Sequence, residues 1–139
     1  MTLKKIIVAY DGSEAAEKAF RHGLELAKNN QARLLVLSVA VPSEPPVDVE
    51  MEDMLEEAEE HYQEDFKRLE TTAKETGVEF ETQIVVGHPA EQIVHRAKEW
   101  GADHIVLGHR GKSRIAQWLL GSVSKRVTSY APCSVTVVR

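Results

Sequence analysis

Three features are missing from this sequence: a second cysteine, a long apolar run and a recognisable leader segment. Because Cys133 is the sole cysteine, the chain cannot form an internal disulfide bond, which fits a reducing compartment. No apolar run approaches the roughly 20 residues that a membrane-spanning helix needs. The opening segment MTLKK precedes a short apolar run without a small-residue cleavage site, so we expect no signal peptide. Together these absences predict a soluble cytoplasmic protein.

Acidic residues are absent from positions 108–139, although the chain as a whole is acidic. The 22 acidic and 17 basic residues give a net charge of −5, which argues against general nucleic-acid binding. Positions 108–139 hold six basic residues, so an anionic ligand, if the protein binds one, is expected there. Positions 44–65 hold 11 acidic residues and no lysine or arginine, which is typical of a solvent-exposed helix face.

Length and composition indicate one globular unit. The 139 residues are 42% hydrophobic and 28% charged, as in an ordinary globular protein. A domain of this length buries roughly two thirds of its unfolded surface, so it can build a core without disulfides or metal. We therefore expect a single domain over residues 1–139.

Apolar strand-like runs alternate with helical periodicity along the whole chain. Strands are predicted at 3–10, 32–41, 79–86, 104–107 and 133–138, and helices at 14–30, 50–76, 89–100 and 122–130. Ser13 is a good N-cap for the first helix, and Pro89 suits the first turn of the third. Strict alternation of this kind predicts a three-layer α/β/α sandwich around a five-stranded parallel sheet.

Each helix carries an apolar face that should pack on the sheet. In the first helix this face is formed by Ala16, Ala19, Phe20, Gly23, Leu24 and Ala27. In the long second helix it runs through Met51, Met54, Leu55, Ala58, Tyr62, Phe66, Leu69 and Ala73. The fourth helix is expected to bury Val123, Val127 and Tyr130.

Polar and glycine-rich turns follow the predicted strands, at the sheet edge where α/β proteins bind ligands. These turns are Asp11-Gly12-Ser13, Gly87-His88-Pro89 and the segment 108–111 (GHRG), and nine residues later Gly121-Ser122 opens the fourth helix. Glycines let backbone N–H groups approach a ligand, and a helix N-terminus offers unpaired donors suited to phosphate. The pattern favours a phosphate-bearing ligand, with turn-shaping glycines as the alternative interpretation.

Several other chemistries fit the sequence less well. Gly111-Lys112-Ser113 resembles the end of a P-loop, but position 106, where that motif needs glycine, is valine. There is no nucleophile elbow of G-x-S-x-G type, and Val86-Gly87 stands where a response receiver would carry its acceptor aspartate. His88 and His109 share the predicted ligand edge but have no evident third metal ligand, so we expect no dedicated metal site.

The pattern G-x-x-G, nine residues, then Gly-Ser, after the strand ADHIVLG, resembles the nucleotide-binding signature of the universal stress protein A family. The opening IIVAYDGS, the segment GHPAEQI and the closing APCSVTVV extend the resemblance over the whole chain. It implies the strand order 3-2-1-4-5, a homodimer formed through Val135–Val138, and a bound adenine nucleotide. That nucleotide would be ATP, ADP or AMP, and any magnesium ion would come with it and lie near Asp11.

The same resemblance assigns roles to nine residues. Ala9, Asp11 and Val39 would line the adenosine part, and Leu107 and Gly108 would flank the ribose. The phosphates would contact Gly111, Gly121, Ser122 and Val123. His109 and Ser134 depart from the small serine-like residue and the proline that the family has there, and His109 would alter affinity by clashing with or contacting the phosphates.

Three functions are compatible with these features. The first is a stress-response or signalling module whose conformation or protein partner changes with bound adenine nucleotide. The second is a slow ATPase, for which the sequence offers a phosphate cradle but no base placed to activate water, so no catalytic residue is assigned. The third is a dimeric adaptor that binds no nucleotide, which the three glycines Gly108, Gly111 and Gly121 argue against.

Overall fold

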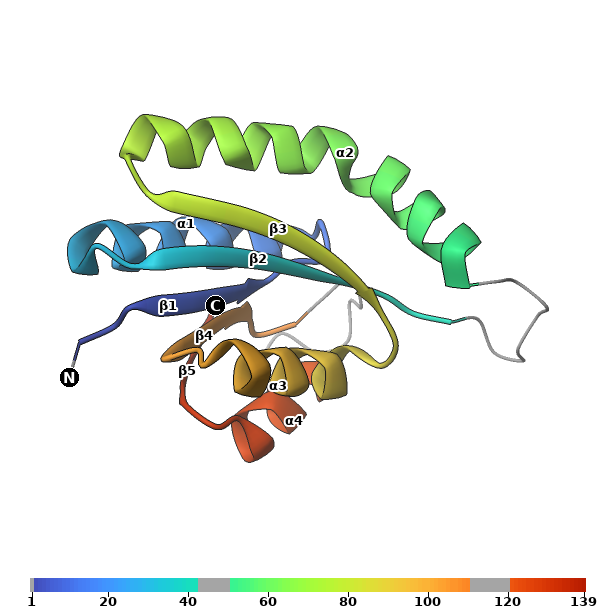
Figure 1. The fold of residues 1–139 in the computed structure, drawn as a ribbon. Helices are drawn as coiled ribbons and strands as arrows, with labels where there is room; N and C mark the ends of the chain where they lie inside the picture. Colours follow the sequence, from blue (N-terminus) through green and yellow to red (C-terminus); the bar gives the residue numbers. More distant parts are fainter. Residues whose placement is uncertain (1, 43–50, 111–120) are drawn as a thin grey trace.

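In the computed structural model, which describes residues 2–42, 51–110 and 121–139, five strands alternate with four helices (Figure 1). The strands are β1 (Lys5–Ala9), β2 (Arg33–Ala40), β3 (Glu79–Val86), β4 (His104–Gly108) and β5 (Ser134–Val138). The helices are α1 (Glu14–Asn30), α2 (Met51–Thr76), α3 (Pro89–Trp100) and α4 (Ser122–Tyr130). All strand pairs are parallel and the order is β3-β2-β1-β4-β5, so the predicted fold and strand order are confirmed.

The helices cover both faces of the sheet, α1 and α2 one face and α3 and α4 the other (Figure 1). Side chains alternate between the faces along each strand, so Ile6 and Val8 pack under α1 and α2 while Ile7 packs under α3 and α4. A strand covered on both faces has no polar side, which explains the continuous apolar runs in the sequence. The fold is thus a three-layer sandwich with two cores.

Strand β1 is the centre of the molecule. Ile7 pairs with Leu35 of β2 and with Ile105 of β4, and Ile6, Ile7 and Val8 are fully buried. The strand covers Lys5–Ala9 and is shorter than the predicted 3–10. Tyr10 N–H still donates to Leu37 O at 2.9 Å, and beyond Tyr10 the chain leaves the sheet. The residue that follows this last contact with β2 is Asp11.

Helix α1 follows the prediction closely. The Ser13 hydroxyl accepts a hydrogen bond from Ala16 N at 3.1 Å, which caps the first turn, and all six residues of the predicted apolar face are buried. The helix ends at Asn30, beyond which Gln31 adopts a left-handed conformation with φ of 53°. The first helix could therefore be predicted from its cap and its periodicity.

Two predicted core residues are exposed. Met51 is 63% exposed, because the first turns of α2 extend past the end of β3 and have no sheet beneath them (Figure 1). Tyr130 is 70% exposed, because it lies in the last turn of the short helix α4, which buries only Ser124 and Val127. In both cases the apolar spacing of the sequence continues beyond the part of the helix that packs on the sheet.

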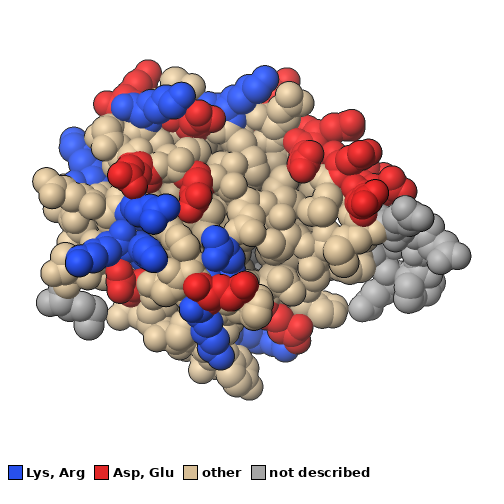
Figure 2. All heavy atoms as spheres, viewed as in Figure 1, with Lys and Arg blue, Asp and Glu red and all other residues tan. Residues whose placement is uncertain are grey.

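The acidic side chains of α2 gather on its solvent side, over its first turns (Figure 2). Glu52, Asp53, Glu56 and Glu57 are all exposed, as the charge pattern predicts for a solvated helix face. Among the described residues, no helix combines the length and the apolar character that crossing a bilayer requires.

Gly23 sits where α1 crosses β1, and we expect Gly23→Ala to destabilise the protein. The added Cβ would lie well inside van der Waals contact with Val8 Cγ2, a fully buried side chain that cannot move aside. Overpacking costs about 1–3 kcal/mol, more than the ~1 kcal/mol that alanine gains over glycine in a helix. Urea denaturation followed by circular dichroism should show a lower midpoint. Lys18→Ala, an exposed change in the same helix, is the control, and an unchanged midpoint for Gly23→Ala would show that α1 can shift outward.

Candidate functional site

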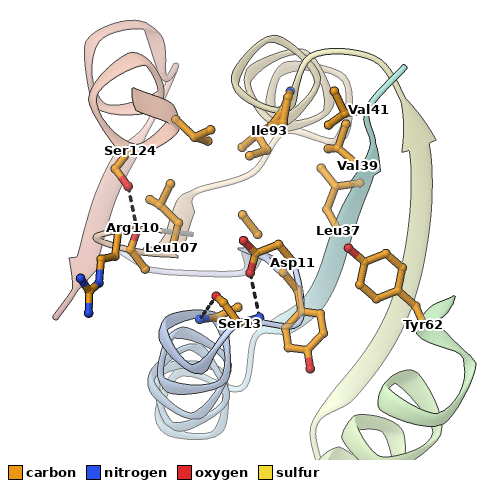
Figure 3. Close-up of a pocket in the computed structure, with 16 residues that line it drawn as sticks. Asp11, Ser13, Leu37, Val39, Val41, Tyr62, Ile93, Leu107, Arg110 and Ser124 are labelled. Carbon is orange, nitrogen blue, oxygen red and sulfur yellow. Dashed lines mark hydrogen bonds between the residues drawn. The ribbon is translucent and has the colours of Figure 1, made fainter. Parts of the chain in front are cut away.

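A cavity of about 330 Å³ opens at the carboxyl edge of the sheet, between the ends of β1 and β4 (Figure 3). The chain leaves β1 toward α1 on one face of the sheet, whereas α4, which follows β4, lies on the other face. Because the helices α1 and α4 lie on opposite faces of the sheet, the described residues leave a space between the two strand ends. This is the topological switch point, where open parallel sheets bind ligands.

Most of the residues singled out in the sequence meet in this cavity. Six of the nine line its wall: Ala9, Asp11, Val39, Leu107, Gly108 and Val123. Gly121 and Ser122 are not part of the wall and lie beside it, at the N-terminus of α4, whose Val123 is a wall residue. Gly111 lies outside the described residues. The sequence thus identified residues from three strand ends and one helix start that the fold brings together.

The two sides of the cavity differ in polarity. Toward α3 and α4 the wall is apolar and includes Val39, Leu107 and the Ile93 side chain. Toward α1 and α2 it carries polar groups from Asp11, Ser13 and Tyr62 (Figure 3). A ligand that fits this cavity needs one flat or apolar part and one part rich in hydroxyl groups.

The carboxylate of Asp11 is fixed within its own turn through one of its two oxygens. Its Oδ1 accepts a hydrogen bond from Ser13 N at 2.9 Å, and the intervening Gly12 has φ of 81°, a left-handed conformation that suits glycine. The turn aims the carboxylate at the middle of the cavity (Figure 3). Asp11 is therefore a fixed acceptor for hydroxyl or amino groups of a ligand.

Two buried serines hold the backbone on either side of the switch point. The Ser38 hydroxyl donates to Tyr10 O at 2.7 Å, and the Ser124 hydroxyl donates to Gly108 O, also at 2.7 Å. They are the buried polar residues in the part of the chain that the structure describes. Each satisfies a carbonyl at the end of a strand where the ladder stops, so the edges of the cavity are fixed from both sides.

The glycines have packing reasons that the sequence did not reveal. A Cβ on Gly108 would lie 2.7 Å from Ala15 Cβ and 3.0 Å from Ala15 O, so α1 can approach β4 only because this residue is glycine. A Cβ on Gly121 would lie 3.2 Å from Arg110 Cα and 3.3 Å from His109 O. Both glycines therefore have a role in the fold that is independent of any ligand.

Among the described residues, no side chain caps the N-terminus of α4. Gly121 is the N-cap and supplies no side-chain hydrogen bond to the first turn, while its own N–H donates to His109 O at 2.6 Å. The first N–H groups of a helix have no intrahelical acceptor, and they carry partial positive charge. Arg110 lies in the wall on the same side. This end of the cavity is suited to an anion.

His109, which departs from the expected small residue, does not line the cavity. Its N–H donates to Val138 O at 2.9 Å, and its ring Nδ1 is buried without a hydrogen-bond partner among the described atoms. Within residues 2–42, 51–110 and 121–139, no group of three or more His, Cys, Asp or Glu side chains is arranged to hold a metal ion.

Several wall residues were not identified from the sequence. Pro89 belongs to a turn that the sequence placed at the ligand edge but was given no role, and Leu37, Val41 and Ile93 lie close to predicted strand or helix ends. Tyr62 comes from the middle of α2, about 50 positions after Asp11, and the sequence placed it in the core. No local motif marks it, because its place in the wall depends on how α2 packs over the sheet.

Tyr10, Glu17 and Arg68 form a polar cluster behind the part of the cavity wall that contains Tyr10 and Tyr62. The Tyr10 hydroxyl donates to the Glu17 carboxylate, and Arg68 forms an ion pair with the same carboxylate, with its second contact at 3.1 Å. Burial alone would raise the pKa of Glu17, but hydrogen bonds from Arg68 and Tyr10 outweigh it and lower that pKa. Burial and the hydrogen bond with Glu17 raise the pKa of Tyr10, so its hydroxyl stays protonated. The cluster ties β1, α1 and α2 together.

A doubly wound parallel sheet with a ligand-sized cavity at its switch point defines an α/β protein of the class that binds small ligands at that edge. The chain belongs to the universal stress protein family, whose family model matches residues 2–139. The resemblance seen in the sequence is thereby confirmed.

Relatives and solved structures agree with this assignment. A universal stress protein of Methanocaldococcus jannaschii is 36% identical over 140 residues, covering 98% of this chain and 82% of the relative. Universal stress protein YxiE of Bacillus subtilis is 37% identical over 147 residues, covering 97% of this chain and 98% of the relative. The structure of the universal stress protein UspA from Lactobacillus plantarum has a TM-score of 0.87 at 29% identity, covering 100% and 99% of the two chains.

Two further similar structures contain adenine nucleotides. One is a universal stress protein in complex with cAMP, with a TM-score of 0.76 at 26% identity, covering 100% of this chain and 98% of the other. The other is the universal stress protein from Archaeoglobus fulgidus in complex with dAMP, with a TM-score of 0.72 at 26% identity and full coverage of both chains.

We expect Ser124→Ala to destabilise the fold, because the change leaves the Gly108 carbonyl without its buried partner. An unsatisfied buried group costs about 1–3 kcal/mol. Ser129→Ala is the matched control, since Ser129 is exposed on the same helix and its hydroxyl donates to Lys125 O at 2.9 Å. Urea denaturation should separate the two variants, and equal midpoints would mean that Ser124 does not hold the strand end.

Removing Arg68 should have a pH-dependent effect on stability. Because the pKa of Glu17 is lowered in the folded protein, its stabilising contribution is present above the unfolded value of about 4.3 and is lost as the pH falls through the folded pKa. Arg68→Met should therefore lower the free energy of unfolding at pH 7 by on the order of 1 kcal/mol for this half-exposed arginine, which appears as a lower urea midpoint. The difference from the unaltered protein should shrink toward pH 3.

Lys74→Met serves as the control for that experiment. Lys74 forms an exposed i,i+4 pair with Glu70 at 3.0 Å on the same helix, so its removal should change little at either pH. A midpoint difference for Arg68→Met that is equal at pH 7 and pH 3 would assign the effect to lost packing instead of the ion pair.

Proposed function

We propose that this universal stress protein binds an adenine nucleotide (ATP, ADP or AMP) in the cavity between β1 and β4. The observation that carries the proposal is the meeting, at one cavity, of an apolar side, a fixed carboxylate and the N-terminus of a helix. A nucleotide has the matching three parts: a flat base, a hydroxylated sugar and a phosphate chain.

The base fits the apolar side of the cavity. Val39, Ile93 and Leu107 offer surfaces for its faces, and Ala9 at the end of β1 leaves room beneath it. A volume of about 330 Å³ is at the lower end of the range for small-ligand sites, about 300–1,000 Å³. The cavity therefore suits adenosine, and the phosphates would extend out of it along the wall.

The phosphates fit the end of the cavity where α4 begins. There Gly121, whose own N–H is bonded to His109 O, opens the helix, Ser122 and Val123 follow it in the first turn with backbone N–H groups, and Arg110 adds a positive charge that suits phosphate oxygens. Gly111, in the same predicted set, lies outside the described residues. A magnesium ion would neutralise phosphate charge and come bound to the nucleotide, with Asp11 as the carboxylate in reach of the site.

The complexes of similar proteins with cAMP and dAMP support the choice of adenine. The described wall carries one carboxylate, Asp11, with no second acid or histidine beside it to activate a water molecule. We therefore propose a binding protein of the cytoplasm, a single domain over residues 1–139, that signals stress through nucleotide-dependent conformation or partner binding. Slow hydrolysis of ATP is compatible with this role.

We also propose that two copies pair through β5. This strand lies at the edge of the sheet, and Val135, Val137 and Val138 remain partly exposed on it. An apolar edge strand with free backbone groups favours pairing with another chain.

Asp11→Asn should weaken the binding of adenosine and ATP by the same factor, about tenfold. The amide keeps the oxygen that accepts from Ser13 N, so the turn is retained, while the charged acceptor for the sugar is lost. Isothermal titration calorimetry with both ligands measures the effect. Asp53→Asn, an exposed change on α2, should leave both affinities as they are.

Asp11→Asn is a more specific test than a substitution of Gly121 by a larger residue. A side chain at position 121 would crowd the backbone of His109 and Arg110 even without ligand, so its effect on binding would not report the phosphate contact alone. Two results would contradict the proposal. One is no binding heat with millimolar ATP and magnesium for the unaltered protein, which would favour the adaptor function. The other is an unchanged affinity for adenosine in Asp11→Asn, which would place the sugar elsewhere.

A further inference from the structure

The polar groups in the wall of the cavity divide into those already engaged and those that face a ligand. The Ser13 hydroxyl caps α1, and the Ser124 hydroxyl donates to Gly108 O at 2.7 Å. The Tyr10 hydroxyl is turned away from the cavity and donates to Glu17. On the side toward α1 and α2, the groups that remain are the second oxygen of Asp11 and the proton of the Tyr62 hydroxyl, whose oxygen is in contact with the Ser38 side chain.

The ring of Tyr62 is fixed by its neighbours. It stacks on Phe66 with centroids 5.4 Å apart and planes 12° from parallel, and it meets the edge of Tyr10 at 6.2 Å. The residue is only 7% exposed although it belongs to the long surface helix α2. Figure 3 shows the ring projecting from α2 with its hydroxyl directed at the cavity, toward Asp11 and Leu37.

The surroundings of this hydroxyl keep it neutral and able to form hydrogen bonds. Burial raises the pKa of Tyr62, and the nearby carboxylate of Asp11 raises it further, against an opposing contact with Ser38. A neutral phenol both donates and accepts, whereas the Asp11 carboxylate only accepts. The two groups lie on the same polar side of the cavity and differ in what they offer a ligand.

We propose that Tyr62 is a specificity-determining residue that, together with Asp11, recognises the adjacent 2′- and 3′-hydroxyl groups of a ribose. This inference rests on the proposed nucleotide site and adds the choice of sugar to it. Neighbouring hydroxyls need two polar partners on one side, and the base on the apolar side would turn the sugar toward Asp11 and Tyr62. A site built to bond a hydroxyl discriminates against the ligand that lacks it, because its own buried group is then unpaired.

The test compares ATP, 2′-deoxy-ATP and 3′-deoxy-ATP by calorimetry on the unaltered protein and on Tyr62→Phe. The unaltered protein should bind at least one of the two deoxy nucleotides about threefold to tenfold more weakly than ATP. In Tyr62→Phe that ratio should fall to about one, through weaker binding of ATP, with little change for the deoxy nucleotide. Phenylalanine keeps the stacked ring, and the urea midpoint checks that the variant folds.

Tyr130→Phe is the matched control, since Tyr130 is 70% exposed on α4 and should leave all three affinities unchanged. The inference is overturned if the unaltered protein binds the three nucleotides equally. It is also overturned if Tyr62→Phe still binds the deoxy nucleotide more weakly than ATP by the same factor. Equal weakening of all three nucleotides would overturn it too, because that result would assign Tyr62 a structural role. Failure of the nucleotide site itself gives a different result, because the unaltered protein would then bind none of the three.

Discussion

The burial of β1 on both faces and along both edges is the constraint on which the rest of the structure depends. From Ile6 to Ala9 its side chains are apolar, and Tyr10 is buried with its hydroxyl bonded to Glu17, so the first residue at its carboxyl end that directs a polar group at the cavity is Asp11. Because β4 neighbours β1 and the helices α1 and α4 lie on opposite faces of the sheet, that residue emerges at the cavity. The strand that anchors the two cores thus also fixes where the cavity lies, and a change that loosens β1 would disturb both.

The cavity keeps its shape because the backbone around it is bonded and packed independently of any ligand. Ser38 and Ser124 satisfy carbonyls at the ends of β1 and β4, and Gly108 lets α1 approach β4 to the distance of direct contact. Fixed walls lower the conformational entropy that a ligand must offset on binding. Gly108, which the family resemblance places beside the ribose, is equally a requirement of helix packing.

Local chemistry in the sequence was sufficient for the elements, and the family resemblance supplied six residues of the cavity wall. The cap at Ser13, the period of α1 and the doubly buried strands are encoded within short segments, so their prediction is confirmed. Met51 and Tyr130 were wrongly placed in the core, because the pattern does not show where the packing surface beneath a helix ends. The position of Tyr62 in the wall depends on the path of α2 across the sheet, which no segment of the chain contains by itself.

The two faces of the sheet contribute different things to the site. From the α3 and α4 side come apolar surfaces and a helix N-terminus, which suit the base and phosphates that all adenine nucleotides share. From the α1 and α2 side come Asp11 and Tyr62, and behind them the cluster of Tyr10, Glu17 and Arg68 joins α2 to β1. The position of the Tyr62 hydroxyl therefore depends on ion pairing at the back of the wall. On the proposal made above, substitutions along α2 that displace Tyr62 change which sugar is accepted, while the surfaces for the base and the phosphates on the opposite face stay as they are.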